Sequence, residues 1–218
     1  LLQQRDQAVQ LPPLMPPLRE EDTPGAVCYR PMPEIYAGYQ GGGLFGGGLG
    51  NADGYMPHMA VLYALPPREK RAVGHFYLDG VWRAWPEAMA FAGQDGGKMV
   101  LPYTAVSVNA VLAPSADEVE LALNLRPSAE PPLVEVQQNG RYLAEYQAGR
   151  DVRFTDDGVS YVAVTRPRLY HLVENLDYES HELNLTFRAS GLALYTFTFT
   201  TCTAPDDVSD SKGTYQVR

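Results

Sequence analysis

Three glycines near the start of the sequence have the spacing of a phosphate-binding loop. Gly41, Gly43 and Gly46 fit the pattern G-x-G-x-x-G within the glycine- and tyrosine-rich residues 36–55. That pattern binds a dinucleotide when a strand precedes it, a helix follows it and an acidic residue lies about 20 positions later. Prolines flank this stretch, and no acidic residue lies near Val61. We therefore interpret it as a flexible loop with tyrosine anchors.

Aromatic side chains are the stronger candidates for ligand binding. Their flat apolar faces stack on sugar rings, while carboxylates and amides bond the sugar hydroxyls. The predicted stacking residues are Tyr36, Tyr39, Tyr55, Trp82 and Trp85. Their expected polar neighbours are Asp79, Glu87, Asn109 and Asp151. Packing in the core or at a sheet edge is the alternative role, and it is the favoured one for Trp82.

Catalytic and metal-binding patterns are weak in this sequence. The four histidines (His58, His75, His171 and His181) form no H-x-H or H-E-x-x-H pair, and no G-x-S-x-G motif is present. Adjacent acidic residues fall in segments expected to be linker, turn or tail. We predict no catalytic residue, no metal site and no cofactor. Asp156 and Asp157, whose loop carboxylates could supply oxygen ligands, are the candidates for a calcium site as the alternative.

Two cysteines, Cys28 and Cys202, lie near opposite ends of the chain. Because they form no C-x-x-C pair, the sequence carries no dithiol redox motif and no cysteine zinc cluster. A disulfide between them would tie the entry segment to the last strand. Two unpaired thiols that pack as small hydrophobic side chains are the alternative.

Composition limits the partners that this chain can have. The 218 residues are 45% hydrophobic, enough for one sizeable core, and the net charge of −9 opposes binding to nucleic acid. No apolar run reaches the roughly 18 residues that a membrane-spanning helix needs. The sequence leaves open whether a leader or an anchor precedes Leu1.

Short runs of alternating polarity separated by turn residues predict an all-β antiparallel sandwich, with a jelly roll as its form. In the last run, Tyr195, Phe197 and Phe199 are expected on one face and the intervening threonines on the other. One short helix is predicted at Pro86–Ala92. The predicted strands are Met59–Leu65, Arg71–Tyr77, Lys98–Tyr103, Ala105–Leu112, Glu118–Leu125, Leu133–Gln138, Tyr142–Glu145, Tyr161–Val164, Arg168–Glu174, His181–Arg188 and Leu192–Cys202.

The N-terminal residues have a different character. Leu1–Val9 is typical of the end of a helix, and the prolines that follow favour an extended spacer. We predict a helical tail and linker from an upstream domain at 1–32, a sandwich domain with an extended Pro/Gly-rich arm at 33–203, and a polar tail at 204–218. An ordinary frayed terminus is the alternative for the first segment.

Several motifs occur together in a characteristic order, after "PEIYAGY" at Pro33–Tyr39. They are Gly74–Glu87 ("GHFYLDGVWRAWPE"), Val106–Leu112, Ala148–Phe154 ("AGRDVRF"), Arg166–Val173 ("RPRLYHLV"), His181–Phe187 and Gly191–Thr200. Together they resemble the C-terminal domain of DipZ-type, cytochrome c biogenesis-related proteins, which follows a thioredoxin-like domain. The resemblance implies a sandwich similar to carbohydrate-binding modules. Two departures are the missing C-x-x-C domain and the ending "FTFTTC", where the family usually has glycine.

From these residues and this resemblance we expect a non-catalytic, extracytoplasmic binding module. Its partner would be a protein or a glycan, with a thioredoxin-like domain upstream in the parent protein and a membrane nearby. The alternative is a structural subunit of a larger membrane-associated bacterial complex, in which the N-terminal arm lies along partner chains. A hydrolase is a third and weaker hypothesis. If residues 11–55 are ordered by contacts within their own chain, that favours ligand binding over assembly.

Overall fold

The computed structural model describes residues 25–43, 47–123 and 131–203, in two compact units. Unit 2 is Tyr29–Thr201, and unit 1 comprises the segments on either side of it. The predicted helix at Leu1–Val9, most of the proline-rich linker and the polar tail lie outside the described residues. Within the described part, no helix is long and apolar enough to span a membrane.

Strands dominate the described chain. The first half contains β1 (Val27–Cys28), β2 (Ile35–Tyr36), β3 (Gly48–Leu49), β4 (Ala60–Tyr63), β5 (His75–Ala84) and β6 (Met89–Phe91). The second half contains β7 (Gly97–Ala113), β8 (Leu133–Gln138), β9 (Arg141–Tyr142), β10 (Arg153–Phe154), β11 (Ser160–Ala163), β12 (Arg168–Phe187), β13 (Ala193–Thr200) and β14 (Cys202–Thr203). The helical turns are η2 (Arg68–Lys70), α2 (Glu118–Leu123) and η3 (Glu145–Gln147).

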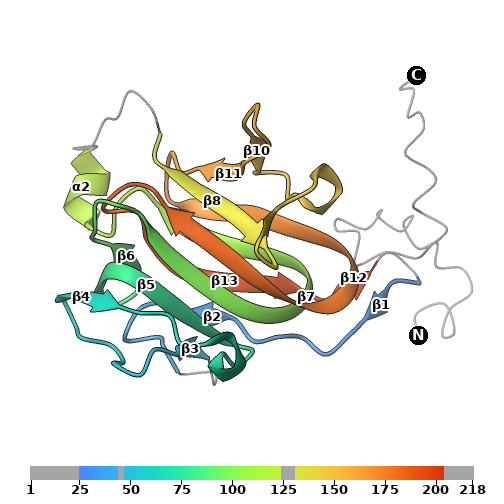
Figure 1. Ribbon diagram of the computed structural model, residues 1–218, viewed down its shortest axis with the longest axis horizontal. Helices are drawn as coiled ribbons and strands as arrows, with labels where there is room; N and C mark the ends of the chain where they lie inside the picture. Colours follow the sequence, from blue (N-terminus) through green and yellow to red (C-terminus); the bar gives the residue numbers. More distant parts are fainter. Residues whose placement is uncertain (1–24, 44–46, 124–130, 204–218) are drawn as a thin grey trace, which may run out of the picture. The chain divides into compact units, whose positions relative to one another are not determined.

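The long strands β7 and β12 connect the layers of unit 2. They pair antiparallel along most of their lengths, and Figure 1 shows them side by side. The other edge of β7 pairs with β5 at residues 98–100 and with β13 at residues 107–113. The strands β8, β11 and β10 extend the sheet beyond β12. The predicted all-β, largely antiparallel sandwich is confirmed.

The sheet closes on itself at one end of unit 2. The short strand β6 pairs with β5 on one side and with β13 on the other, and both of these strands pair with β7. A closed arrangement leaves fewer free strand edges. It also surrounds part of the core, including the fully buried Trp82, Phe91 and Phe187.

A buried polar network lies where β12 is irregular. The hydroxyl of Tyr103 donates to Oε1 of Gln138, whose amide donates to Oδ1 of Asn175 at 2.8 Å. Nδ2 of Asn175 in turn donates to the hydroxyl oxygen of Tyr103 at 3.2 Å. Burial raises the pKa of Tyr103 well above its ordinary value. Because the three side chains satisfy one another inside the core, they fix the local course of β7 and β12.

Two predicted elements are wrong in type. Residues 118–125, predicted as a strand, begin with the helix α2, and residues 86–92, predicted as a helix, contain the strand β6. Asp117 explains the first difference, because its Oδ1 accepts hydrogen bonds from two backbone N–H groups of α2. Pairing of β6 with two neighbouring strands explains the second, because tertiary contacts override weak local propensity.

The residues Asn139-Gly140 form a tight turn. Both residues have positive φ values, 53° and 78°, and they join β8 to β9. This is the backbone that a type I′ hairpin turn requires. The alternation predicted for the last strand holds only in part. Phe197 is fully buried, but a register shift between Leu194 and Thr196 takes Tyr195 out of the main core.

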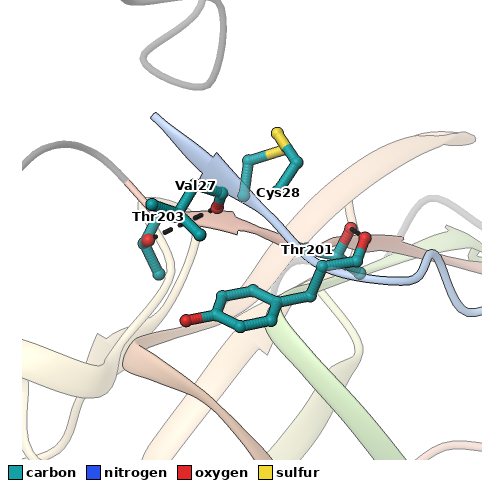
Figure 2. The surroundings of a disulfide bond; sticks show 6 residues. Val27, Cys28, Thr201 and Thr203 are labelled. Atoms are coloured by element: carbon teal, nitrogen blue, oxygen red, sulfur yellow. Dashed lines mark hydrogen bonds between the residues drawn. A yellow bond between two sulfur atoms is a disulfide. The ribbon is translucent and has the colours of Figure 1, made fainter. Parts of the chain in front are cut away.

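Unit 1 contains β1 and β14, which pair antiparallel over two residues each. Cys28 lies directly opposite Cys202, and a disulfide bond joins them across 174 residues of sequence (Figure 2). Of the two arrangements that the sequence left open, the structure has the bonded one.

Candidate functional site

Trp82 does not contribute to any surface site. It is fully buried, with its ring centroid 5.5 Å from that of Phe91 and 4.9 Å from that of Phe187, both in edge-to-face contacts. Its Nε1 donates a 2.9 Å hydrogen bond to the backbone carbonyl of Asp79. Since no face of the indole reaches solvent, the interpretation of Trp82 as a stacking residue is corrected to that of a core residue.

Trp85 follows β5 directly and is only partly buried. Its ring meets the edge of His58 at 5.8 Å between centroids, and His58 meets Tyr39 at 5.6 Å in the same manner. The Tyr39 hydroxyl lies 3.0 Å from Nε2 of His58. His58 has a left-handed φ of 62°, which costs a residue with a side chain about 1–2 kcal/mol. These three rings form one aromatic cluster at the surface.

The glycine-rich segment docks against the turn that follows Trp85. The N–H of Tyr39 donates to the Trp85 carbonyl at 3.1 Å, and the N–H of Gln40 donates to the Pro86 carbonyl at 2.9 Å. A Cβ at Gly38 would lie 2.3 Å from the backbone carbon of Glu87, so only glycine permits this approach. Gly38 thus serves a close backbone contact. Of the three glycines with the phosphate-loop spacing, a Cβ at Gly41 would lie 2.7 Å from the Tyr36 side chain, Gly43 has open space around it, and Gly46 lies outside the described residues.

Two surface hollows lie beside this turn. The Trp85 hollow has a volume of about 220 Å³ and is lined by Trp85 together with residues of β5, β6 and the start of α2. The Tyr36 groove has a volume of about 530 Å³ and lies between the glycine-rich segment, the turn and β13. Behind them, a cluster of buried alanines supports both Trp85 and Tyr195. The alanines are Ala88, Ala90 and Ala193.

Charged and hydroxyl groups line the Trp85 hollow. Arg83 comes from β5, Ser115 and Asp117 directly precede α2, and Glu120 lies in the first turn of that helix. The Ser115 hydroxyl donates to Oε2 of Glu120 at 2.6 Å. Oδ1 of Asp117 accepts from two N–H groups of the first helical turn at 2.8 and 3.2 Å. These bonds position both carboxylates before any ligand arrives, beside a tryptophan and an arginine.

None of these four polar residues was among the candidates from the sequence. Asp117 followed three residues later by Glu120 is the pattern of a helix N-cap, and that pattern could have placed both carboxylates at a helix start. Arg83 carried no comparable signal, because its polar neighbours Ser115, Asp117 and Glu120 lie more than 30 residues away in sequence.

The Tyr36 groove is less polar and is bordered by two tyrosines. The Tyr36 hydroxyl donates to Oε2 of Glu34 at 2.7 Å, and this hydrogen bond, together with the carboxylate charge, raises the pKa of Tyr36. Burial raises the pKa of Tyr195, and the charges of Glu87 and Glu118 raise it further. Both phenols therefore stay protonated, and the single proton of Tyr36 is donated to Glu34.

Residues 32–200 match the sequence model of a protein family described as the thioredoxin like C-terminal domain. The match covers well over half of the chain. The chain belongs to this family. The resemblance expected from its motifs is thereby confirmed as far as a thioredoxin-like C-terminal domain.

Similarity to solved structures is low. "Structure of a family two carbohydrate esterase from Cellvibrio japonicus" is similar at 9% identity and a TM-score of 0.35, covering 69% of this chain and 33% of that chain. The match therefore spans about a third of the esterase chain, and at this score it carries no argument. A comparison with curated proteins found no match.

In this thioredoxin-like C-terminal domain, Asp151 connects two of the predicted family motifs. Its Oδ1 lies 2.8 Å from Nη2 of Arg168, and its Oδ2 accepts the N–H of His171 at 2.8 Å. Burial alone would raise the pKa of Asp151, but the hydrogen bonds and the arginine charges lower it overall. Asp151 thus fastens residues 148–154 to β12, and its bonds give it a structural role rather than a place in either hollow.

Other predicted site residues also lie away from the hollows of the domain. The Tyr55 hydroxyl accepts the N–H of Leu49 at 3.1 Å, and burial raises its pKa to about 12. Asp79 lies in β5, where its carbonyl bonds the core tryptophan, and Asn109 lies within β7. Glu87 is the predicted polar neighbour that the structure does place at the Tyr36 groove.

The calcium candidates occupy an exposed hairpin turn. Asp156 and Asp157 lie between β10 and β11, where the N–H of Thr155 bonds the carbonyl of Val159 at 3.0 Å. Among the residues that the structure describes, no three His, Cys, Asp or Glu side chains gather as a metal site. Calcium binding at this turn stays a prediction.

Proposed function

We propose that this chain is a non-catalytic, extracytoplasmic binding module, accessory to a thioredoxin-like redox protein, and that its Trp85 hollow binds one sugar ring of a glycan. The observation that carries the proposal is the position of Trp85 beside Arg83, Asp117 and Glu120 in one hollow. The family supports the accessory role. The disulfide supports an oxidising, extracytoplasmic location.

The chemistry of the hollow suits a sugar. An indole face stacks on the C–H face of a pyranose, and fixed carboxylates accept hydrogen bonds from its hydroxyls. At about 220 Å³ the hollow is smaller than the roughly 300–1,000 Å³ pockets that enclose drug-sized ligands. It therefore suits a single ring at the end or side of a longer glycan. Two carboxylates against one guanidinium favour a neutral or amino sugar over an acidic one.

Contacts of the N-terminal segment support binding over assembly. Between Ala37 and Gln40, three backbone N–H groups donate to carbonyls of Tyr195, Trp85 and Pro86 in the same chain. This described part of the segment is thus ordered by its own domain and requires no partner chain. A structural role in a membrane-associated complex remains the alternative proposal.

A protein ligand is a second candidate, and the Tyr36 groove favours it. The groove has a volume of about 530 Å³ and is bordered by Tyr36, Tyr195 and Pro86. Tyrosine-lined grooves with hydrogen-bond donors at their rim suit extended peptide segments. Binding to the groove would leave the Trp85 hollow unused.

Binding to a glycan array, and to soluble polysaccharides in a second assay, tests the proposal. We expect binding that Trp85→Ala and Arg83→Ala each weaken at least tenfold, which corresponds to about 1.4 kcal/mol. Arg83 is exposed, so its replacement leaves the packing intact. Tyr146→Ala is the matched aromatic control, because Tyr146 is 65% exposed and lines neither hollow. Absence of binding on the array, or equal loss in the control, would contradict the proposal.

A further inference from the structure

The disulfide of unit 1 joins a very small piece of sheet. β1 and β14 contribute two residues each, with Val27 opposite Thr203 and Cys28 opposite Cys202. Thr203 Oγ1 adds a weak hydrogen bond of 3.4 Å to the Val27 carbonyl, drawn as a dashed line in Figure 2. Two-stranded pairs are marginally stable in water even when they are longer. The covalent bond is therefore the main force that keeps these two strands together.

The bond is also accessible. Cys28 is exposed and Cys202 is partly exposed, in contrast to a disulfide buried between the layers of a sandwich. Thiol–disulfide exchange requires a thiolate to approach one sulfur directly, and its rate depends on that access. Exposure of Cys28 makes its Sγ the sulfur that an incoming thiolate reaches.

Unit 2 has a closure of its own. The N–H of Tyr29 donates to the Thr201 carbonyl at 3.0 Å, and the Thr201 hydroxyl donates to the Tyr29 carbonyl at 3.2 Å. The Tyr29 ring stacks on Tyr178, with centroids 4.5 Å apart and planes 4° apart. The first and last residues of unit 2 thus stay paired when the bond beyond them is cut.

We propose that Cys28–Cys202 is a thiol-exchange site, which a dithiol reductant opens while unit 2 remains folded. A thiolate of the dithiol attacks Sγ of Cys28 and forms a mixed disulfide, and Cys202 leaves as a thiolate that takes up a proton. The second thiol of the reductant, as its thiolate, then attacks the mixed disulfide and releases Cys28, which is protonated in turn. The dithiol loses two electrons and becomes a disulfide, and this chain gains two electrons and two protons.

The consequence is local. Reduction releases β1 from β14 and leaves every element of the sandwich in place. The two segments that flank unit 2 are then no longer linked to each other. The oxidised and reduced forms therefore differ in the link between these two segments, and they keep the same hollows. This inference is independent of the sugar proposed above.

Native-state reduction of the whole chain by dithiothreitol tests the proposal. The free thiols are trapped with iodoacetamide at successive times and counted by mass, and the rate is compared with that of the chain denatured in guanidinium chloride. We expect the native rate to lie within about tenfold of the denatured rate, since access does not require unfolding. A disulfide reached only through global unfolding would react at least about a thousandfold more slowly.

Fluorescence of the buried Trp82 and near-ultraviolet circular dichroism follow the fold in the same samples. We expect both signals to persist after reduction and in the double variant Cys28→Ser with Cys202→Ser. A native rate more than a hundredfold below the denatured rate would overturn the proposal. Loss of the tertiary signals on reduction of the wild-type chain would overturn it equally. The wild-type measurement decides even where the double variant fails to fold.

Discussion

Replacement of Gly38 by alanine tests the contact on which the candidate site depends. The new Cβ would lie 2.3 Å from the backbone carbon of Glu87 and 2.3 Å from the carbonyl oxygen of Pro86. Both are backbone atoms, so no side-chain rotation relieves the collision. The segment must therefore move away from the turn, and the hydrogen bonds from Tyr39 and Gln40 to that turn break.

The expected magnitude follows from these two bonds. Each backbone hydrogen bond contributes about 0.5–1.5 kcal/mol, so Gly38→Ala should destabilise the domain by about 1–3 kcal/mol. In a domain of this size, that lowers the melting temperature by roughly 2–12 °C. Glycan binding should fall as well, because Tyr39 and His58 hold Trp85 in place.

Thermal denaturation measures the loss of stability, and amide hydrogen exchange measures the loss of the two backbone hydrogen bonds. Exchange at Tyr39 and Gln40 should accelerate in the variant. Gly158→Ala is the matched control, because that glycine has a φ of 78° in a distant hairpin with open space around it. It should cost about 1–2 kcal/mol through backbone strain and leave binding unchanged. An unaltered melting temperature with both amides still protected in Gly38→Ala would refute the reasoning.

Three further predictions concern stability. Reduction of Cys28–Cys202 removes a closure across 174 residues of sequence, so in the chain-entropy model it should cost about 5 kcal/mol, or roughly 10–20 °C in scanning calorimetry, with the sandwich still folded at room temperature; an unchanged melting temperature would contradict this. Trp82→Ala should cost about 3–5 kcal/mol in urea denaturation, because it empties a fully buried site; a loss below about 1 kcal/mol would place Trp82 outside the core. The fold lowers the pKa of Asp151, so its contribution is present above the unfolded value of 3.8 and is lost as pH falls through the lower folded value. In the variant Asp151→Asn, the free energy of unfolding should therefore fall less steeply as the pH is lowered. An acid dependence identical to that of the wild type would exclude a stabilising role for the Asp151 carboxylate.

Local patterns predicted the sandwich because strand periodicity is a local property. Leu133–Gln138 alternates in burial, and its sequence alternates in polarity over residues 134–137. Asn139-Gly140 specifies its turn by backbone preference alone. Alternation of polarity also predicted a strand at "EVELAL" (Glu118–Leu123), and there the prediction was wrong. Asp117 caps that segment as a helix whose Val119 and Leu123 remain exposed. Alternation of polarity therefore indicates a strand only where a sheet is available to pair with it.

Long strands were predicted as fragments for a related reason. The sequence shows a polar interval at residues 175–180, yet β12 continues through it to Phe187. The irregular register between Glu174 and Glu179 exposes that interval, while Asn175 turns inward to Tyr103 and Gln138. A buried polar triad of one tyrosine and two amides, formed from three strands, has no signature in any one of them.

The candidate site was predicted in its aromatic half and missed in its polar half. Tyr36, Tyr39 and Trp85 fall near one another because the glycine-rich segment lies against the turn after β5. The polar half comes largely from the start of α2, more than 30 residues further along the chain. A prediction that assigned those residues to a strand could not bring their carboxylates to Trp85.

The two tryptophans show how one strand serves both the fold and the site. In a strand, residues two apart share a face, so Trp82 and Ala84 point inward, and both are buried. Trp85 is an odd number of positions from Trp82, and it therefore emerges on the opposite side, toward the hollow. The buried ring between Phe91 and Phe187 fixes the end of β5, and that end determines where Trp85 leaves the sheet. Loss of packing at Trp82 should therefore weaken glycan binding without any contact to the sugar.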